Sequence, residues 1–579
     1  MFPVHFIFVL FSILMVEGQV IVDTYSGKVE GVEVKSIIPD EKYYSFMGIP
    51  YAEPPVGRLR FKEPQPHPGW GDVLETKKEK KPCAQFFMPV RNVKQYGFCG
   101  EEDCLHLSVH TPILPTNDNL ALPVIVFLFN EQFRMTYNAS KEYGPDFFMK
   151  EEVLLVTISH RVGSLGFLYF EDDVIPGNNG IKDVVLALKW IQINIIKFGG
   201  DPFKITLMGN TGGATVVDIL LNSPKAKGLF SAAILQSGTS WNSELFNSKP
   251  KDRAIALINE LENTVTTSSQ LISELSRIPL DEITAAELHS VHADEARKIQ
   301  RSITPFGPVI ERDRPDAIIT QLPESKTIDI DIPVMIGFNT REAIEMSERL
   351  LRKPQYLSFV DRDFLFIWPI RVNCSFEINT NVYSKAIQEI KDFYFDEGYV
   401  KISRPGEYLT YIGDVFSFYP IDYTVRKYVE AATKVYYYAF DYSGELNMRK
   451  KNVLEEAMTV EGTWGASIGD ELCYLFVCKK IKKSYKKLME DAESEEMIVL
   501  RNMVRLWTNF AKTGNPTPPG DEFTWTPASI ENKEILVISE ELEMKSNVYG
   551  DRVKFWDDFL AKYKEKAVDG IIKGTKDEL

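Results

Sequence analysis

A glycine-flanked turn within residues 198–214 carries the residue types of a site for nucleophilic chemistry. Its sequence, FGGDPFKITLMGNTGGA, runs from a short apolar strand through the turn and into the helical pattern ATVVDILL. This is the layout of a nucleophile elbow, in which the central residue adopts a strained backbone conformation and flanking glycines permit close approach. Such a turn normally holds serine in the pattern GxSxG. Here Thr211 holds that position, with a hydroxyl group but also a β-methyl group where strain tolerates branching least.

Strands and helices that alternate along the chain must position this turn. The helical pattern DVVLALKWIQINIIKF begins at Asp183, and a second long helix, IVLRNMVRLWTNFAK, lies between the last two strands. Several strand-like runs are apolar on both faces, which is typical of a parallel sheet covered by helices. The runs are VIVDTYSGKVEGVEV from Val20, LHLSVHT from Leu105, PVIVFLF from Pro123, VLLVTIS from Val153, KITLMG from Lys204, FSAAILQ from Phe230, IPVMIGF from Ile332, VYYYAF from Val435 and ILVIS from Ile535. The pattern predicts an α/β fold with one large, mostly parallel mixed sheet whose early strands are antiparallel.

The composition excludes several classes of protein. Among 579 residues, Lys plus Arg number 66 and Asp plus Glu number 82, which gives a net charge of −16. A protein held to nucleic acid by phosphate contacts has the opposite balance, so nucleic acid is not an expected partner. With 44% hydrophobic residues the chain can bury a large core, and it lacks the composition of a disordered protein.

Further motifs along the chain carry a resemblance to a known family. They are YSFMGIPYAEPPVGRLRF from Tyr44, EDCLHLSVHTP from Glu102, SHRVGSLGFL from Ser159, GNNGIKDVVLALKWIQ from Gly177, LFSAAILQSG from Leu229 and WTNFAKTGNPTP from Trp507. Over residues 20–563 the chain resembles type-B carboxylesterases, the cholinesterase-like α/β hydrolases. The resemblance implies an α/β-hydrolase fold. It also implies hydrolysis of carboxylic esters by a serine, a glutamate and a histidine in that chain order, with backbone N–H donors from an HGGG loop and with no cofactor or metal.

Only one member of that triad is kept in this sequence. The resemblance places the nucleophile at Thr211, the acid at Glu342 in GFNTREA and the base at Ile468 in ASIGDELCYLF. Isoleucine can neither accept nor donate a proton. In this fold the base follows the acid, yet every histidine precedes Glu342: His5, His67, His106, His110, His160, His289 and His292. We interpret His289 and His292, in a polar helical stretch, as surface residues.

The segment that the resemblance assigns to the oxyanion hole is also altered. In PVIVFLFNEQF, the histidine and three glycines of the family pattern are replaced by Phe129, Asn130, Glu131 and Gln132. Those glycines let backbone N–H groups face the developing oxyanion, together with the N–H group after the nucleophile, here that of Gly212. We expect the new side chains to crowd this space and Glu131 to add negative charge beside it.

Two hypotheses about function follow. In the first, the chain is a hydrolase scaffold without useful esterase activity that binds an apolar or ester-like small molecule or a partner protein. In the second, it is a residual carboxylic ester hydrolase that uses Thr211 with Glu342 or with a water-mediated base. Loss of a triad base or nucleophile costs on the order of 10⁶ in kcat, and each oxyanion donor is worth about 10² to 10³, so we favour the first.

Both ends of the chain indicate the secretory pathway. The apolar run at residues 6–16, followed by small Gly18, predicts a signal peptide over residues 1–18, with an uncleaved anchor as the alternative. The chain ends in a KDEL sequence formed by Lys576, Asp577, Glu578 and Leu579. A retrieval receptor reads such a terminus as an address for the lumen of the endoplasmic reticulum. No other apolar run is long enough for a membrane span, and no repeat or linker divides residues 19–575, which we expect to form a single domain.

Six cysteines fit an oxidising compartment. They allow up to three disulfides, and their spacing fixes neither a pairing nor a metal site. The family resemblance pairs Cys83 with Cys104 and leaves Cys99, inside the loop that they close, free or differently paired. We interpret Cys473 and Cys478 as core thiols rather than a redox pair, because they lie close together on one apolar segment.

Two N-x-S motifs, at Asn138 and Asn373, predict glycosylation in that compartment. The pairing of Cys374, within the second motif, stays open.

A lysine-rich run at residues 479–487, KKIKKSYKK, precedes the acidic stretch EDAESEE. Ile481, Tyr485 and Leu488 keep a helical apolar spacing, so we interpret the run as the solvated face of a helix. A patch that binds a partner is the alternative.

Overall fold

The computed structural model describes residues 20–87, 97–115, 121–136, 142–243, 245–246, 249–292 and 294–573. The predicted signal peptide, Asn138 and the KDEL terminus lie outside these residues. Within these ranges, no helix has both the length and the apolar character that a membrane span requires.

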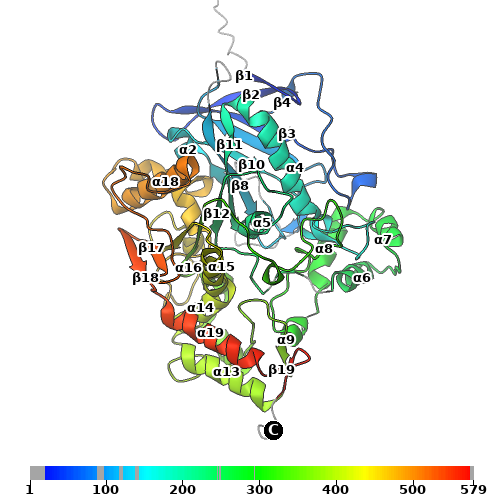
Figure 1. Ribbon diagram of the computed structural model, residues 1–579, viewed down its shortest axis with the longest axis vertical. Coiled ribbons are helices and arrows are strands. Elements are labelled where there is room, and N and C mark those ends of the chain that lie inside the picture. The colour runs from blue at the N-terminus through cyan, green and yellow to red at the C-terminus, as the bar shows by residue number, and fades with distance from the viewer. Residues whose placement is uncertain are drawn as a thin grey trace, which may run out of the picture.

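A large mixed sheet runs through the described part of the chain (Figure 1). Its strand order is β1-β2-β3-β7-β10-β8-β11-β12-β13-β15-β17-β18, with the short β4 beside β2. The strands are β1 (Val20–Thr24), β2 (Gly27–Lys35), β3 (Lys42–Pro50), β4 (Leu74–Glu75), β7 (His106–Thr111), β8 (Leu122–Asn130), β10 (Leu154–Ile158), β11 (Gly200–Thr211), β12 (Ala232–Gln236), β13 (Val334–Asn339), β15 (Val435–Phe440), β17 (Glu534–Ile538) and β18 (Leu542–Ser546). Neighbouring strands are parallel from β10 to β17, whereas β1, β2, β3 and β7 pair antiparallel. The predicted α/β sheet with an antiparallel beginning is confirmed.

Helices cover both faces of this sheet. They include α2 (Asp146–Lys150), α3 (Gly163–Phe167), α4 (Asn179–Asn194), α5 (Gly212–Leu221), α6 (Pro250–Glu260), α7 (Ser268–Leu275), α8 (Leu280–Ala286), α9 (Glu295–Ile299), α10 (Ala343–Met346), α11 (Glu348–Arg352), α12 (Leu357–Arg362), α13 (Asn381–Tyr394), α14 (Pro405–Gly413), α15 (Tyr419–Glu430), α16 (Met448–Leu454), α17 (Lys482–Leu488), α18 (Glu495–Thr513) and α19 (Gly550–Lys564). Figure 1 shows α19 lying along α13 at the end of the molecule away from β1.

The alternation of side chains along β8 explains the two helical layers. Val126 lies in the apolar cluster that includes the inner side of α4, and the next residue, Phe127, lies in the opposite cluster with α18. Both side chains are fully buried. A strand between two helical layers must therefore be apolar at every position, as the run PVIVFLF predicted.

The carboxyl ends of neighbouring parallel strands bring the predicted site residues together. β8 ends at Asn130 and β11 ends at Thr211, and the strand register pairs these two residues. β13 ends at Asn339, shortly before Glu342. In open α/β sheets this edge is where reactive groups gather, so the topology alone brings the ends of three segments to one place.

A disulfide joins Cys83 to Cys104, as the family resemblance implied. Cys99, inside the loop that this bond closes, and Cys374 carry free thiols.

A second disulfide corrects one interpretation from the sequence. Cys473 and Cys478 are not separate thiols but are bonded to each other, with Cα atoms 5.4 Å apart. Both lie in the core, as expected. The chain turns between the 3-10 helix η7 (Asp470–Tyr474) and the short strand β16 (Val477–Cys478), and this turn, which the apolar pattern does not reveal, brings the sulfur atoms together.

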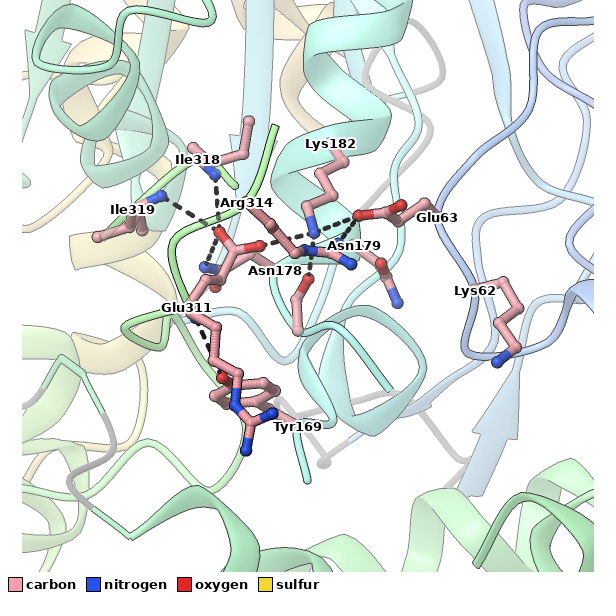
Figure 2. A network of polar contacts seen from close by, with 12 residues as sticks. Lys62, Glu63, Tyr169, Asn178, Asn179, Lys182, Glu311, Arg314, Ile318 and Ile319 are labelled. Atoms are coloured by element: carbon pink, nitrogen blue, oxygen red, sulfur yellow. Dashed lines mark hydrogen bonds and ion pairs between the residues drawn. The ribbon is translucent and has the colours of Figure 1, made fainter. Parts of the chain in front are cut away.

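A buried polar network fixes the segment that leads into α4 (Figure 2). Lys182 Nζ lies 2.6 Å from a carboxylate oxygen of Glu311 and 2.7 Å from one of Glu63. Glu311 also accepts hydrogen bonds from the side chain of Asn178 and from two backbone N–H groups. Burial lowers the pKa of Lys182, and the charge of Glu311 opposes that effect. The polar residues of the GNNGIKD motif therefore serve the fold.

Candidate functional site

Thr211 lies at a sharp turn between β11 and α5. Its φ is 52° and its ψ is −117°, a backbone conformation that branched side chains rarely adopt. Glycines are required around it, because a Cβ atom on Gly209 would come within 2.3 Å of the Gly213 backbone. A Cβ atom on Gly213 would in turn come within 2.1 Å of the carbonyl oxygen of Leu128. This is the geometry of a nucleophile elbow.

The hydroxyl group of Thr211 is engaged by a backbone acceptor. Its Oγ1 donates a hydrogen bond to the carbonyl oxygen of Asn130 over 2.7 Å. The Thr211 residue is only 9% exposed, so few other partners can reach the hydroxyl group. A hydroxyl group that attacks an ester must give its proton to a base, and the observed bond competes with that use.

Ile468 shares a small cavity with Thr211, where the resemblance places the base. We call this cavity, of about 40 Å³, the elbow cavity. It is lined by Gln132, Phe133, Thr211, Gly212, Thr215, Ser237, Gly238, Asn242, Leu245, Met346, Phe416, Ser417 and Ile468. The position that the resemblance assigns to the base therefore holds a hydrocarbon side chain that cannot move a proton.

The histidines of the described ranges lie away from the elbow cavity. His110 and His160 are buried elsewhere, and burial lowers the pKa of both rings, to about 3 for His110. His289 and His292 are exposed, in agreement with their interpretation as surface residues. No described histidine lines the elbow cavity. An upstream histidine therefore does not replace the missing base there.

Glu342 is buried and does not line the elbow cavity. Its Oε1 accepts hydrogen bonds from Ser237 Oγ at 2.6 Å and from the backbone N–H of Asn339 at 2.8 Å. Its Oε2 has no hydrogen-bond partner among the described residues. Burial raises the pKa of Glu342 to about 8, and the nearby Glu471 acts in the same direction. At neutral pH the carboxyl group is therefore mostly protonated, and it lacks the negative charge that orients a catalytic histidine.

Glu471 is a second buried carboxyl group beside the elbow, and the sequence analysis missed it. Its oxygens accept hydrogen bonds from Asn210 Nδ2 at 2.9 Å, Gln236 Nε2 at 3.3 Å and Asn339 Nδ2 at 2.6 Å. Because Asn210 directly precedes the elbow residue, this network holds the end of β11 in place. Burial raises the pKa of Glu471 to about 7. In the sequence, Glu471 could have been found from its position in the GDEL segment shortly after Ile468.

The side chain of Asn130 lies beside Gly212, the residue that follows the elbow threonine. Its Oδ1 accepts a hydrogen bond from the backbone N–H of Phe133 at 2.6 Å. The same oxygen would lie 2.7 Å from a Cβ atom on Gly212, so it stands beside the residue that follows the elbow threonine. An oxygen acceptor in this position engages the loop donor and repels a second oxygen that carries negative charge.

Of the other two positions at which the family has glycine, Gln132 lines the elbow cavity and Glu131 does not. Glu131 faces a neighbouring cavity of about 160 Å³, which Arg134 and Glu287 also line. Burial raises the pKa of Glu131, and the charge of Arg449 opposes that rise. The carboxyl group that we expected beside the oxyanion therefore lies in the next cavity.

Comparison with known proteins assigns this arrangement to a family. The model of the carboxylesterase family matches residues 18–556. The chain belongs to the carboxylesterase family. It is 30% identical over 550 residues to juvenile hormone esterase of Tribolium castaneum, with 89% of each chain covered. It is 32% identical over 516 residues to esterase FE4 of Myzus persicae, with 88% of this chain and 86% of that one covered.

The elbow cavity of this carboxylesterase-family chain is too small for an ester substrate. Sites for drug-sized ligands occupy about 300–1,000 Å³, and a single water needs about 10–15 Å³. At about 40 Å³, the elbow cavity has room for a few waters. The site therefore has the elbow of a carboxylesterase without the space in front of it.

Proposed function

We propose that this carboxylesterase-family chain has lost useful esterase activity and acts in the lumen of the endoplasmic reticulum by binding a partner protein. The observation that carries the proposal is the 2.7 Å hydrogen bond from the Thr211 hydroxyl group to the Asn130 carbonyl oxygen, in a cavity that Ile468 also lines. The nucleophile, base and oxyanion positions each hold a group that is unsuited to acyl transfer.

The size of the expected rate loss supports this proposal. Removal of a hydrolase's base or nucleophile costs on the order of 10⁶ in kcat, and what remains depends on an intact oxyanion hole. Each oxyanion donor is worth about 10² to 10³. In this chain the nucleophile and base positions and the oxyanion loop are all altered, so we expect ester hydrolysis close to the uncatalysed rate.

A protein partner fits the site better than an apolar or ester-like small molecule. The elbow cavity holds about 40 Å³, and its neighbour holds about 160 Å³. The neighbour is lined by the charged Glu131, Arg134 and Glu287 and by apolar residues that include Phe86, Met135, Leu288 and Phe306. Neither cavity has the volume of a substrate-sized ligand. Binding is therefore expected away from these two cavities.

The luminal location rests on the two chain ends and is supported by the described residues. The signal peptide over residues 1–18 and the KDEL terminus, read by a KDEL-type retrieval receptor, supply the address. Two disulfides are suited to an oxidising lumen. Asn373 is exposed, as glycosylation at this position requires.

A fluorophosphonate probe tests the loss of catalysis. We expect the purified full-length protein to stay unlabelled and to hydrolyse short acyl esters no faster than the Thr211→Ala variant. Labelling that Thr211→Ala abolishes would favour the competing hypothesis, a residual carboxylic ester hydrolase, which the esterase names of the relatives make worth testing.

A thermal-shift screen with lipidic and ester-like compounds tests the kind of ligand. A compound that binds the folded state raises the apparent melting temperature by mass action. We expect no change in the melting temperature with any of these compounds. A clear rise with one of them would mean that the ligand is a small molecule and not a partner protein.

A further inference from the structure

The lysine-rich run forms a compact basic surface on α17 and on the 3-10 helix η8 (Lys479–Ile481) that precedes it. The side chain of Tyr485 points into the core, and Ile481 and Leu488 are half-buried, as the helical spacing predicted. We define the α17 basic surface by five exposed lysines, which are Lys480, Lys482, Lys483, Lys486 and Lys487; Lys479, which precedes them, is exposed too but is not counted in this surface.

This surface is held rigidly on the body of the protein. The Tyr485 hydroxyl group accepts a hydrogen bond from the backbone N–H of Cys478 at 3.1 Å. It also lies within hydrogen-bond distance of the carbonyl oxygens of Cys473 and Phe476, at 2.8 and 3.0 Å. The disulfide between Cys473 and Cys478 closes the same turn. The backbone that carries the lysines is therefore held in place, so a partner does not have to order this segment on binding.

The lysines of this surface are not paired with carboxylates in the described structure. None of its five lysines forms an ion pair with a described residue. The acidic stretch that follows forms no ion pair with them among the described residues, and Glu493 pairs with Arg501, at 3.8 Å. Positive charge is concentrated here although the whole chain carries a net charge of −16.

The same lysines act against the stability of their own helix. Lys482 and Lys486, like Lys483 and Lys487, are like charges at the i,i+4 spacing, which destabilises a helix. The helix dipole gives no net support in either direction, because Lys482 and Lys483 lie in the first turn, where it disfavours positive charge, and Lys486 and Lys487 lie in the last turn, where it favours it. Residues that lower the local stability of the fold, with no contact that offsets the loss, are expected at functional sites.

We propose that the α17 basic surface docks an acidic segment of a partner protein. Carboxylates of such a segment would pair with the lysines and remove the repulsion between them. This inference goes beyond the loss of catalysis at Thr211, because an active enzyme with the same surface would bind in the same way.

An anionic membrane is a poorer fit to this surface. The apolar side of α17 faces the core, so no apolar face is left to enter a bilayer. Exposed acidic residues border the lysines, namely Glu490, Asp491, Glu493 and Glu495. A flat anionic surface would meet these carboxylates as well, and the net charge of the chain adds repulsion. A flexible acidic segment can contact the lysines alone.

The test measures binding of a fluorescent polyglutamate peptide to the full-length protein. The surface variant replaces Lys482, Lys483, Lys486 and Lys487 by glutamine. The control variant replaces four exposed lysines that are scattered over the chain: Lys78, Lys189, Lys298 and Lys385. Both variants change the net charge equally. We expect the surface variant to weaken binding about tenfold or more and the control variant to change it less than about twofold.

Salt dependence and crosslinking locate the contact. Added salt should weaken binding to the unmodified protein, because exposed charges are screened. Zero-length carbodiimide crosslinking of the peptide should map to lysines of the α17 basic surface. Equal binding by the two variants, crosslinks confined to other lysines, or binding of phosphatidylserine vesicles in place of the peptide would overturn the proposal. The esterase assay is independent of all these outcomes.

Discussion

The hydroxyl group of Thr211 donates a hydrogen bond to the carbonyl oxygen of Asn130, and the same two residues are paired in the register of the adjacent parallel strands β11 and β8. In an active elbow the hydroxyl group must be available to a base. Here it joins the end of β11 to the end of β8. A group with the chemistry of a nucleophile therefore contributes to the structure of the sheet edge.

The structural role of this bond can be measured with Thr211→Val. Valine keeps the shape of threonine but cannot donate, so we expect the free energy of unfolding to fall by about 0.5–1.5 kcal/mol. Thr211→Ser keeps the donor and removes the branched methyl group at a strained position, so it should be neutral or slightly stabilising. Urea unfolding gives both values. A valine variant as stable as the unmodified protein would show that the bond contributes nothing.

Restoration of the lost groups should return some ester hydrolysis. The variant combines Thr211→Ser and Ile468→His with glycine at each of three loop positions, which are Asn130, Glu131 and Gln132. Because Glu342 has a pKa of about 8, it becomes the anion that orients the new base only at alkaline pH. We therefore expect kcat/KM to rise with pH through this value.

The matched control for that experiment omits Ile468→His and keeps the other changes. Circular dichroism establishes that both variants are folded. If the control hydrolyses short acyl esters as fast as the full set, the absence of a base at position 468 is not what limits the scaffold.

Glu342 should also make stability depend on pH. Its pKa rises on folding from an ordinary value of 4.5 to about 8, so between these values the folded state holds a proton that the unfolded state has lost. The stabilisation is complete below about pH 4.5 and is lost as the pH rises toward 8. Glu342→Gln mimics the protonated group, so its free energy of unfolding should fall less steeply over this window.

Denaturant unfolding at a series of pH values from 5 to 8.5, roughly the span of this linkage, compares the two proteins. Glu531→Gln, at an exposed carboxylate, is the control and should keep the slope of the unmodified protein. Identical slopes for the Glu342 variant and the unmodified protein would mean that this carboxyl group titrates alike in the folded and unfolded states.

The network in Figure 2 should be sensitive to loss of its cation. Lys182→Met leaves Glu311 buried without its ion pair, so we expect a loss of about 3–5 kcal/mol in the free energy of unfolding. Lys189→Met, at an exposed position of the same helix, should change it by less than about 0.5 kcal/mol. Addition of Glu311→Gln should recover part of the loss, and a further loss instead would show that the two side chains are not coupled.

The parts of the fold that the sequence predicts are those with a local pattern. The run that forms β8 is apolar at every position because helices cover both of its faces, and this pattern can be read from the sequence alone. The turn at Thr211 is visible because close approach of strand and helix permits only glycine at Gly209 and Gly213.

The parts that could not be predicted depend on contacts between distant segments. Glu471 takes its hydrogen bonds from Asn210, Gln236 and Asn339, which come from the ends of three strands. Nothing in the residue types indicates that Asn130 would turn its side chain toward Phe133 and lie beside Gly212. A side-chain orientation of this kind is decided by packing in three dimensions.

The disulfide between Cys473 and Cys478 has a practical consequence for how the protein is prepared. It closes the turn on which Tyr485 rests, and a bacterial cytosol keeps thiols reduced. In protein produced there, the turn under Tyr485 would lack its disulfide, and the α17 basic surface would be held less rigidly. Recombinant protein should therefore be produced in a bacterial periplasm or in a eukaryotic secretory host. Mass spectrometry should count its free thiols, to show that the disulfide has formed, before a failure to bind is attributed to the protein.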